Sequence, residues 1–293
     1  MSGNLAVIIQ SLIGGVGIGS VYALVALGFS MVYRSMGLVN FANGQIFMVG
    51  AYIGTIFYVS MHTNFLFAFA LAVVLTGLLG MVIERILRPL EKMDLMYMML
   101  GTLGIGIVLQ NLSIIIFGPD GIAVPYPIKN HPWMLNGISI SPYTLIVIGS
   151  TALIVIVLQV FLVRTKLGLA LRASAQEREM AMALGMNVGL MNALTLAIGS
   201  ALAAYGGMLV GPIFYVSPDM STSVGISGFA AAILGGLGSI PGAIVGGLFF
   251  GVLQQLVATQ FSSWSDVIAF VVFVAVLIFK PSGIVGERTV DKL

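Results

Sequence analysis

Long uncharged stretches alternate with short charged segments along this chain. Residues 35–83 include 49 positions without a charged side chain, and residues 220–265 include 46. An α-helix rises about 1.5 Å per residue, so about 20 residues cross a hydrocarbon core of about 30 Å. Each of these two stretches is therefore long enough for two membrane spans.

Five shorter apolar stretches predict one span each: residues 4–33, 95–119, 143–163, 180–218 and 264–279. The first is either one helix or a helix broken at the glycines between Gly14 and Gly19. Turns are expected at residues 62–64 and 235–242, where polar residues, glycine and proline interrupt the apolar pattern. The predicted fold class is all-α, a polytopic integral membrane protein of about eight or nine transmembrane helices that form a single domain over residues 1–293.

The composition supports a membrane protein and excludes several other classes. Charged residues make up 8% of the 293 positions, against about 25% in soluble domains, and apolar residues make up 59%. So few charges cannot cover the surface of a soluble fold, and such hydrophobicity is the opposite of a disordered chain. A net charge of +2 gives no basic patch for nucleic acid. The chain has no cysteine, which excludes disulfides and thiolate sites.

The charges that do occur predict the orientation of the chain. They concentrate at Arg34 and in residues 84–94, 164–179 and 280–292. Positive residues favour the cytoplasmic side of a membrane. If Arg34 is cytoplasmic, alternating spans place these clusters and the C-terminus there too, with 11 of the 12 Lys and Arg residues. The N-terminus is then external, although the uncharged first 33 residues also allow a re-entrant arrangement.

A proline-rich external loop is predicted over residues 118–142, with room for short helices. Five of the ten prolines lie there, and they prevent a continuous span. His131 lies in this loop and His62 is on the same side, but neither has carboxylate neighbours at ligand spacing. We therefore expect no metal site.

Glycines spaced four residues apart predict close packing of helices. Gly238, Gly242 and Gly246 form one such series. Small residues at this spacing let membrane helices approach each other closely. The alternative is chance, because the chain contains 37 glycines.

Several kinds of chemistry have no residues to support them. No Walker A sequence for binding ATP phosphates occurs. No ionisable residue lies securely in the middle of a predicted span, as coupling to protons or to voltage would need. No Ser/His/Asp set or pair of intramembrane carboxylates is present for catalysis. The chain is therefore expected not to be an enzyme, but a passive pathway that is driven by other subunits or not driven at all.

Residues 164–187 offer a place where another protein can act on the chain. Strong helix formers without a breaker run from Ala173 to Leu184, and Gly185 ends the helix. We expect one short amphipathic helix over about residues 172–185 at the cytoplasmic surface. Such a helix fits a groove in a partner protein, and the alternative is a helix that lies on lipid. Acidic residues mixed with the arginines on its polar face favour the protein groove.

At this segment the chain resembles the membrane subunits of bacterial ABC importers. Their cytoplasmic loop carries Glu-Ala-Ala followed by three residues and Gly. Here Glu179, Ala181 and Gly185 match this signature, while Met180 departs from it and the downstream Ile-x-Leu-Pro is not present. Among these subunits the chain is most similar to branched-chain amino acid permeases of the LivH type. The stretches that carry this similarity are residues 19–28, 40–45, 50–52, 168–173, 201–207 and 235–243.

The resemblance implies a subunit of an ATP-driven importer for Leu, Ile and Val in the bacterial inner membrane. Its partners would be a second, LivM-like permease, two cytoplasmic ATPases and a periplasmic amino-acid-binding protein, besides membrane lipid. The ATPases would bind ATP and Mg²⁺, so this chain would need no cofactor of its own. The ATPase-coupling residues would be Arg172, Ala173, Glu177, Arg178, Glu179, Ala181 and Gly185. Other substrates (urea, short amides or other amino acids) and a free-standing small-solute channel are the alternatives.

Amide side chains within the apolar stretches are candidates for the translocation path. They offer hydrogen bonds without the cost of burying a charge. Their alternative role is hydrogen bonding between packed helices. The candidates are Asn40, Asn43, Gln45, Gln110, Asn111, Gln254 and Gln255.

Overall fold

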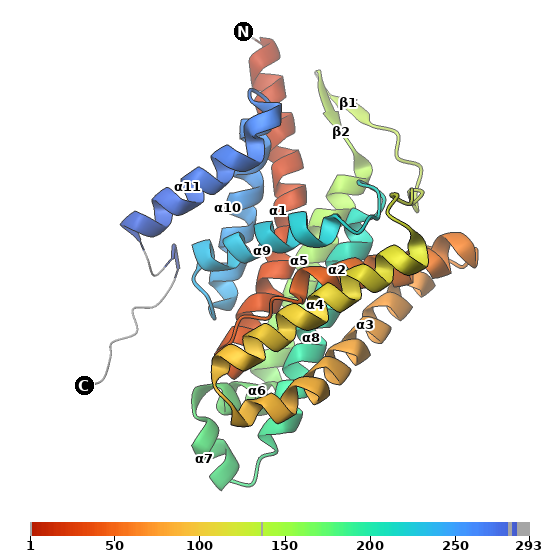
Figure 1. Cartoon of the computed structure of the whole chain (residues 1–293). Helices are drawn as coiled ribbons and strands as arrows, with labels where there is room; N and C mark the ends of the chain where they lie inside the picture. Colours follow the sequence, from red (N-terminus) through yellow and green to blue (C-terminus); the bar gives the residue numbers. More distant parts are fainter. Residues whose placement is uncertain (1, 136, 281–282, 286–293) are drawn as a thin grey trace.

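The computed structural model describes residues 2–135, 137–280 and 283–285, and this part of the chain is almost entirely helical (Figure 1). The helices are α1 (Ser2–Met36), α2 (Asn43–Thr55), α3 (Phe65–Leu87), α4 (Leu95–Phe117), α5 (Pro142–Arg164), α6 (Lys166–Gln176), α7 (Arg178–Ala183), α8 (Val188–Val210), α9 (Met220–Gly235), α10 (Ile240–Ala258) and α11 (Ser265–Phe279). A π-helical turn, η1 (Ile56–Ser60), extends α2, and two 3₁₀ turns are η2 (Arg88–Lys92) and η3 (Ser262–Trp264). The charges expected on the cytoplasmic side between Glu287 and Lys292 lie outside the described residues.

The all-α, polytopic membrane fold is confirmed, but not every predicted span is a full-length helix. Within the described residues, six helices are long and apolar enough to cross a membrane: α1, α3, α4, α5, α8 and α10. The helices α9 and α11 are apolar but shorter, with 16 and 15 residues. The first half of residues 35–83 gives only the 13 residues of α2 and the turn η1. Absence of charge predicts burial in the membrane, but it does not predict helix length.

The long helix α1 forms the centre of the bundle and packs against α5, α8, α9 and α10 (Figure 1). It continues without a break through its glycines. These glycines let α10 approach closely, because a Cβ atom on Gly15 would lie 2.7 Å from the Cα atom of Val252. A Cβ atom on Gly19 would lie 2.9 Å from the carbonyl oxygen of Gly247. The two helices therefore pack backbone against backbone over this region.

The helix α2 begins well inside the bundle rather than at its end. Gly37, with φ of 70°, follows α1, and the chain then turns back along it. The Asn43 side chain donates to the carbonyl oxygen of Val25 over 3.1 Å, and Val25 lies 11 residues before the end of α1. Eleven helical residues rise about 16 Å, so α2 starts at about this depth from the end of α1.

The helix α9 crosses in front of α1 in Figure 1 and meets α10 through glycines. A Cβ atom on Gly246 would meet the Ala231 carbonyl oxygen and lie 2.7 Å from the Gly235 nitrogen. One on Gly242 would meet the carbonyl oxygen of Gly235. Gly238 instead lies in the turn between α9 and α10, with φ of 86°. Two of the three glycines proposed for packing thus lie at the α9–α10 contact, and the third shapes the turn.

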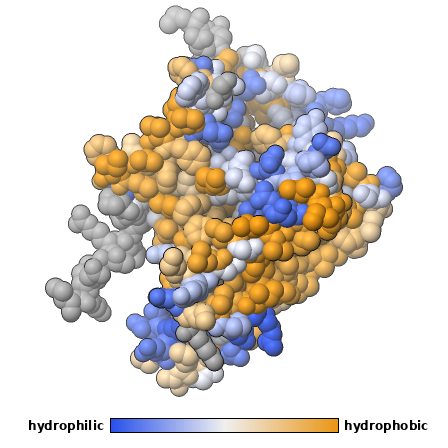
Figure 2. All heavy atoms as spheres, in the orientation of Figure 1, coloured by the Kyte–Doolittle hydropathy of each residue, from blue (hydrophilic) through white to orange (hydrophobic). Residues whose placement is uncertain are grey.

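The two ends of the bundle differ in chemistry. One end carries Arg34, η2, α6 and α7, and we call it the charged end (Figures 1 and 2). The opposite end carries the N-terminus and a hairpin of β1 (Trp133–Leu135) and β2 (Ile138–Ile140). The proline-rich segment 118–142 was expected to be a loop with room for short helices. The structure instead has this hairpin within it. Between the two ends, the face that Figure 2 shows over α3 and α4 is apolar, as a lipid-exposed surface would be.

Candidate functional site

The cytoplasmic helix predicted over residues 172–185 is two helices in the structure. α6 begins with the Thr165 hydroxyl accepting from the Gly168 amide over 2.9 Å. Glu177 then leaves the helical conformation, with φ of −141° and ψ of 90°, and α7 follows it. The prediction of one continuous helix was wrong, because helix propensity alone does not detect a turn that is set by contacts with neighbouring helices.

The tip formed by α7 and the residues after it exposes apolar side chains. Met180 and Leu184 are 62% and 76% exposed, whereas Ala181 is buried against the bundle. Gly185 ends the segment with φ of 79°, a conformation that favours glycine. We call residues 177–185 the coupling tip.

The seven residues proposed for ATPase coupling divide between this tip and the bundle. Glu177, Arg178, Glu179 and Gly185 are exposed at the tip. Arg172 and Ala173 lie on α6 and are partly buried, and Arg172 lines a small crevice that Met31, Arg34 and Ile240 also line. Together with the exposed Met180 and Leu184, they form a mixed apolar and charged surface, which suits contact with another protein.

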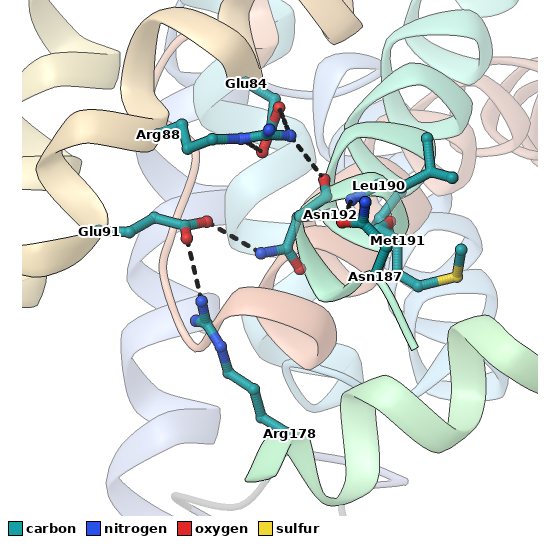
Figure 3. A network of polar contacts seen from close by, with 10 residues as sticks. Glu84, Arg88, Glu91, Arg178, Asn187, Leu190, Met191 and Asn192 are labelled. Carbon is teal, nitrogen blue, oxygen red and sulfur yellow. Dashed lines mark hydrogen bonds and ion pairs between the residues drawn. The ribbon is translucent and has the colours of Figure 1, made fainter. Parts of the chain in front are cut away.

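A polar network joins the coupling tip to the membrane helices (Figure 3). The Glu91 carboxylate of η2 accepts from the Arg178 guanidinium over 3.0 Å and from the Asn192 amide over 3.0 Å. Asn192 lies on α8 and is only 1% exposed. Its carbonyl oxygen accepts from the Ser35 hydroxyl at the end of α1 over 3.2 Å. Glu91 therefore connects the tip with both α8 and α1.

A second ion pair lies at the end of α3, and its arginine also binds the start of α8 (Figure 3). Arg88 donates twice to the buried Glu84 carboxylate, each time over 3.1 Å. It also donates to the carbonyl oxygen of Gly189 over 3.1 Å. A buried carboxylate needs such a partner, because an isolated charge is costly to remove from water.

Apart from Arg178, these network residues were not singled out from the sequence. Residues 84–94 are visible as a charge cluster, but Glu91 lies 87 residues from Arg178 and 101 from Asn192. A local sequence pattern cannot predict a contact between residues that lie so far apart in the chain. Asn192 lies in an apolar stretch, and nothing in the sequence around it distinguishes it from other polar residues within predicted spans.

Three of the amides proposed for the translocation path lie together around the start of α2. The Asn40 side chain accepts from the Ala42 amide over 3.1 Å, and Asn43 binds the α1 backbone. Gln45 packs against α4, because a Cβ atom on Gly106 would lie 3.0 Å from its carbonyl oxygen. That oxygen is buried and has no hydrogen-bond partner within the described residues.

The other proposed amides lie elsewhere. Gln110 and Asn111 are on α4, and Asn111 donates to Ile107 of its own helix over 2.8 Å. Gln254 of α10 accepts from the Tyr22 hydroxyl over 2.7 Å and donates to the Asp266 carboxylate over 2.6 Å. The proposed path residues are therefore not one cluster.

Two hollows lie on either side of α9. A cavity of about 390 Å³ is lined by Ile18, Val21 and Tyr22 of α1 and by Gln254 and Gln255, and we call it the outer cavity. A second hollow of about 200 Å³ is lined by Phe29 and Gln45, and we call it the inner hollow. Phe29 is closer along α1 to the charged end than residues 18–22 are, so the two hollows lie at different depths.

The described residues hold no group of three or more His, Asp or Glu side chains that could bind a metal ion. The candidate site has three parts: the coupling tip, the network behind it, and the two hollows on either side of α9. The network thus connects the charged end with α1 and α8, two helices that border the outer cavity.

Known proteins are similar in sequence to this chain over almost its whole length. Residues 11–277 match the family described as the permease component of the branched-chain amino acid transport system. The chain is 36% identical to the high-affinity branched-chain amino acid transport system permease protein BraD of Pseudomonas aeruginosa, over 97% of this chain and 98% of that protein. It is 33% identical to the corresponding protein LivH of Salmonella typhimurium, over 100% of both chains. The LivM permease of that organism is 25% identical, over 90% of this chain and 67% of that protein.

This protein is thus a multi-pass membrane protein, and it belongs to the family of branched-chain amino acid transport system permeases.

Proposed function

We propose that this chain is one permease subunit of an ATP-driven importer for branched-chain amino acids and forms half of the translocation path. The observation that carries the proposal is the exposed coupling tip, tied through Glu91 to α8 and α1. The names of the BraD and LivH relatives support the substrate class.

The proposed complex contains partners that supply what this chain lacks. A second permease resembling LivM would complete the path, and two cytoplasmic ATPases would bind ATP and Mg²⁺. A periplasmic amino-acid-binding protein would deliver the substrate at the end of the hairpin. The charged end would face the cytoplasm of a bacterial inner membrane, together with the C-terminus, because positive residues favour that side.

The mechanism follows from the contacts at the charged end. An ATPase that closes on ATP would displace the coupling tip, and Arg178 would carry this displacement to Glu91. Asn192 and Ser35 would pass it to α8 and α1, which would move as rigid bodies between two access states. The ATPases supply the energy and the binding protein supplies most of the selectivity, so the spans need no charged coupling residue.

Co-purification with the ATPase subunits tests this proposal. Glu179→Lys and Gly185→Trp change the exposed tip, and we expect both to abolish recovery of the ATPases while the chain still inserts into the membrane. Asp120→Lys makes the same kind of charge reversal on an exposed residue of the proline-rich segment and serves as the control. ATPase recovery that is equal for all three variants and the unchanged chain would contradict the proposal.

A further inference from the structure

The outer cavity and the inner hollow are bordered by opposite faces of α9. Met220, Ser223 and Val224 line the outer cavity, whereas Thr222, Gly225 and Phe229 line the inner hollow. Successive residues of an α-helix are rotated by about 100°, so these two sets point in opposite directions. The wall between the two spaces is therefore the helix α9 itself.

The outer cavity combines one carboxylate with neutral polar groups and an apolar wall. Asp219 is the only charged residue among those that line it. Its side chain does not cap α9, and no ion pair or hydrogen bond to its carboxylate occurs within the described residues. Ser223 and Gln255 supply hydroxyl and amide groups, and Val21 lies on the apolar side.

We propose that the outer cavity binds the transported amino acid as a zwitterion, with α9 as the floor of the site. This inference rests on the proposed function. The Asp219 carboxylate accepts hydrogen bonds from the substrate ammonium, and Ser223 and Gln255 donate to the substrate carboxylate. The branched side chain packs against apolar residues of α1 and α9.

The size and the surroundings of the cavity suit a small ligand of this kind. Small-molecule pockets measure about 300–1,000 Å³, and this one is about 390 Å³. The Asp266 carboxylate accepts from Gln254 and is not among the residues that line the cavity, which leaves Asp219 as the carboxylate that can accept from an ammonium group. Neutral donors around a single carboxylate suit a ligand with no net charge.

The floor of the cavity is built for close packing. Gly225 meets α2 at Gly44, where an added Cβ atom would lie 3.0 Å from the Gly44 Cα atom. A Cβ atom on Gly228 would meet the side chain of Val25. Passage from the outer cavity to the inner hollow therefore requires a shift of α9 against α1 and α2 at these close contacts.

Thiol labelling tests the site, because the chain contains no cysteine of its own. Ser223→Cys places one thiol in the outer cavity, and Thr222→Cys places one on the opposite face of α9 as the control. The full chain in its complex would be treated with a membrane-impermeant maleimide from the outside. We expect Ser223→Cys to be labelled, and leucine to slow that labelling but not any labelling of Thr222→Cys.

Variants of the charged group test the mode of binding. In the Ser223→Cys background, Asp219→Asn should raise the leucine concentration that halves the labelling rate by about tenfold, the effect of one lost charge-assisted contact. Asp120→Asn changes another exposed aspartate, outside the cavity, and should leave that concentration unchanged. Gln255→Leu provides a second variant should Asp219→Asn not reach the membrane. The compound 4-methylpentanoate, which is leucine without its amino group, should not protect the thiol.

The outcomes separate this inference from the proposed function. ATP-dependent leucine uptake by the unchanged complex tests the proposed function alone. If uptake occurs but Ser223→Cys is not labelled, or is labelled equally with and without leucine, the inference is overturned. Equal protection in the Asp219→Asn and Asp120→Asn variants would overturn the role given to Asp219.

Discussion

At the scale of single residues, Glu91 decides how the coupling tip is connected to the membrane helices. It accepts hydrogen bonds from Arg178, which is exposed, and from Asn192, which is buried. The contact with Arg178 contributes little to stability because water screens exposed pairs. The contact with Asn192 contributes more, since an amide left unsatisfied in the interior costs about 1–3 kcal/mol.

Glu91→Ala should therefore both destabilise the protein and loosen the coupling. We expect a lower melting temperature in detergent, by a few degrees for each kcal/mol lost. We also expect more ATP to be hydrolysed for each leucine transported, because displacement of the tip would no longer be passed through Glu91 to α8 and α1. Both quantities can be measured on the reconstituted complex.

Asp94→Ala is the matched control for this change. Asp94 carries the same charge three residues away, is exposed, and caps no helix with its side chain. A Glu91→Arg/Arg178→Glu double variant should recover part of the coupling that each single change loses. If Glu91→Ala and Asp94→Ala hydrolyse the same amount of ATP per leucine, Glu91 has no coupling role.

At the scale of elements, the contact of α9 with α10 depends on glycines that face each other's backbone. A Cβ atom on Gly246 would meet the Ala231 carbonyl oxygen, and neither backbone can give way without separating the helices. Most of the stability of this pair therefore comes from close van der Waals packing, as in other membrane helices.

Gly246→Ala should destabilise the protein by about 1–3 kcal/mol, because the added methyl group overpacks the α9–α10 contact. Gly149→Ala introduces the same methyl group in α5, where nothing lies within 4 Å, and should be neutral or slightly stabilising. The melting temperatures of the two variants in the same detergent test this difference. A lower value for Gly149→Ala than for Gly246→Ala would refute the packing argument.

At the scale of the whole molecule, the chemical difference between the two ends of the bundle is the basis of the proposed orientation in the membrane. The hairpin and the coupling tip lie at opposite ends (Figure 1). Met134 in the hairpin is 78% exposed and Leu184 at the tip is 76% exposed, so they form a matched pair of labelling positions.

In cells with a permeable outer membrane, an impermeant maleimide should label Met134→Cys from outside. The same reagent should label Leu184→Cys only after the inner membrane is opened, because the proposed orientation places the tip, with its positive residues, in the cytoplasm. The absence of native cysteine makes each introduced thiol the only one in the chain. Labelling of both variants from the same side would contradict the proposed orientation.

Much of the fold could be predicted from the sequence because the membrane imposes simple rules. Residues 95–119 and 143–163 predict single spans, and α4 and α5 occupy almost the same residues. A lipid environment requires every backbone group to be bonded within its own segment, so a long apolar stretch becomes a helix. The rule weakens where other protein surrounds the backbone, and this is why α2 and α9 are shorter than expected.

The sequence by itself determined that this is a helical membrane protein, which residues gather at its charged end, and which family it belongs to. These properties depend on local hydrophobicity and on residue order, which are visible in one dimension. Only the tertiary structure decided that Glu91 meets Arg178 and Asn192, that Glu177 divides the cytoplasmic helix, and that α9 separates two hollows. These features depend on contacts between residues far apart in the chain, and such contacts arise only when the helices pack together.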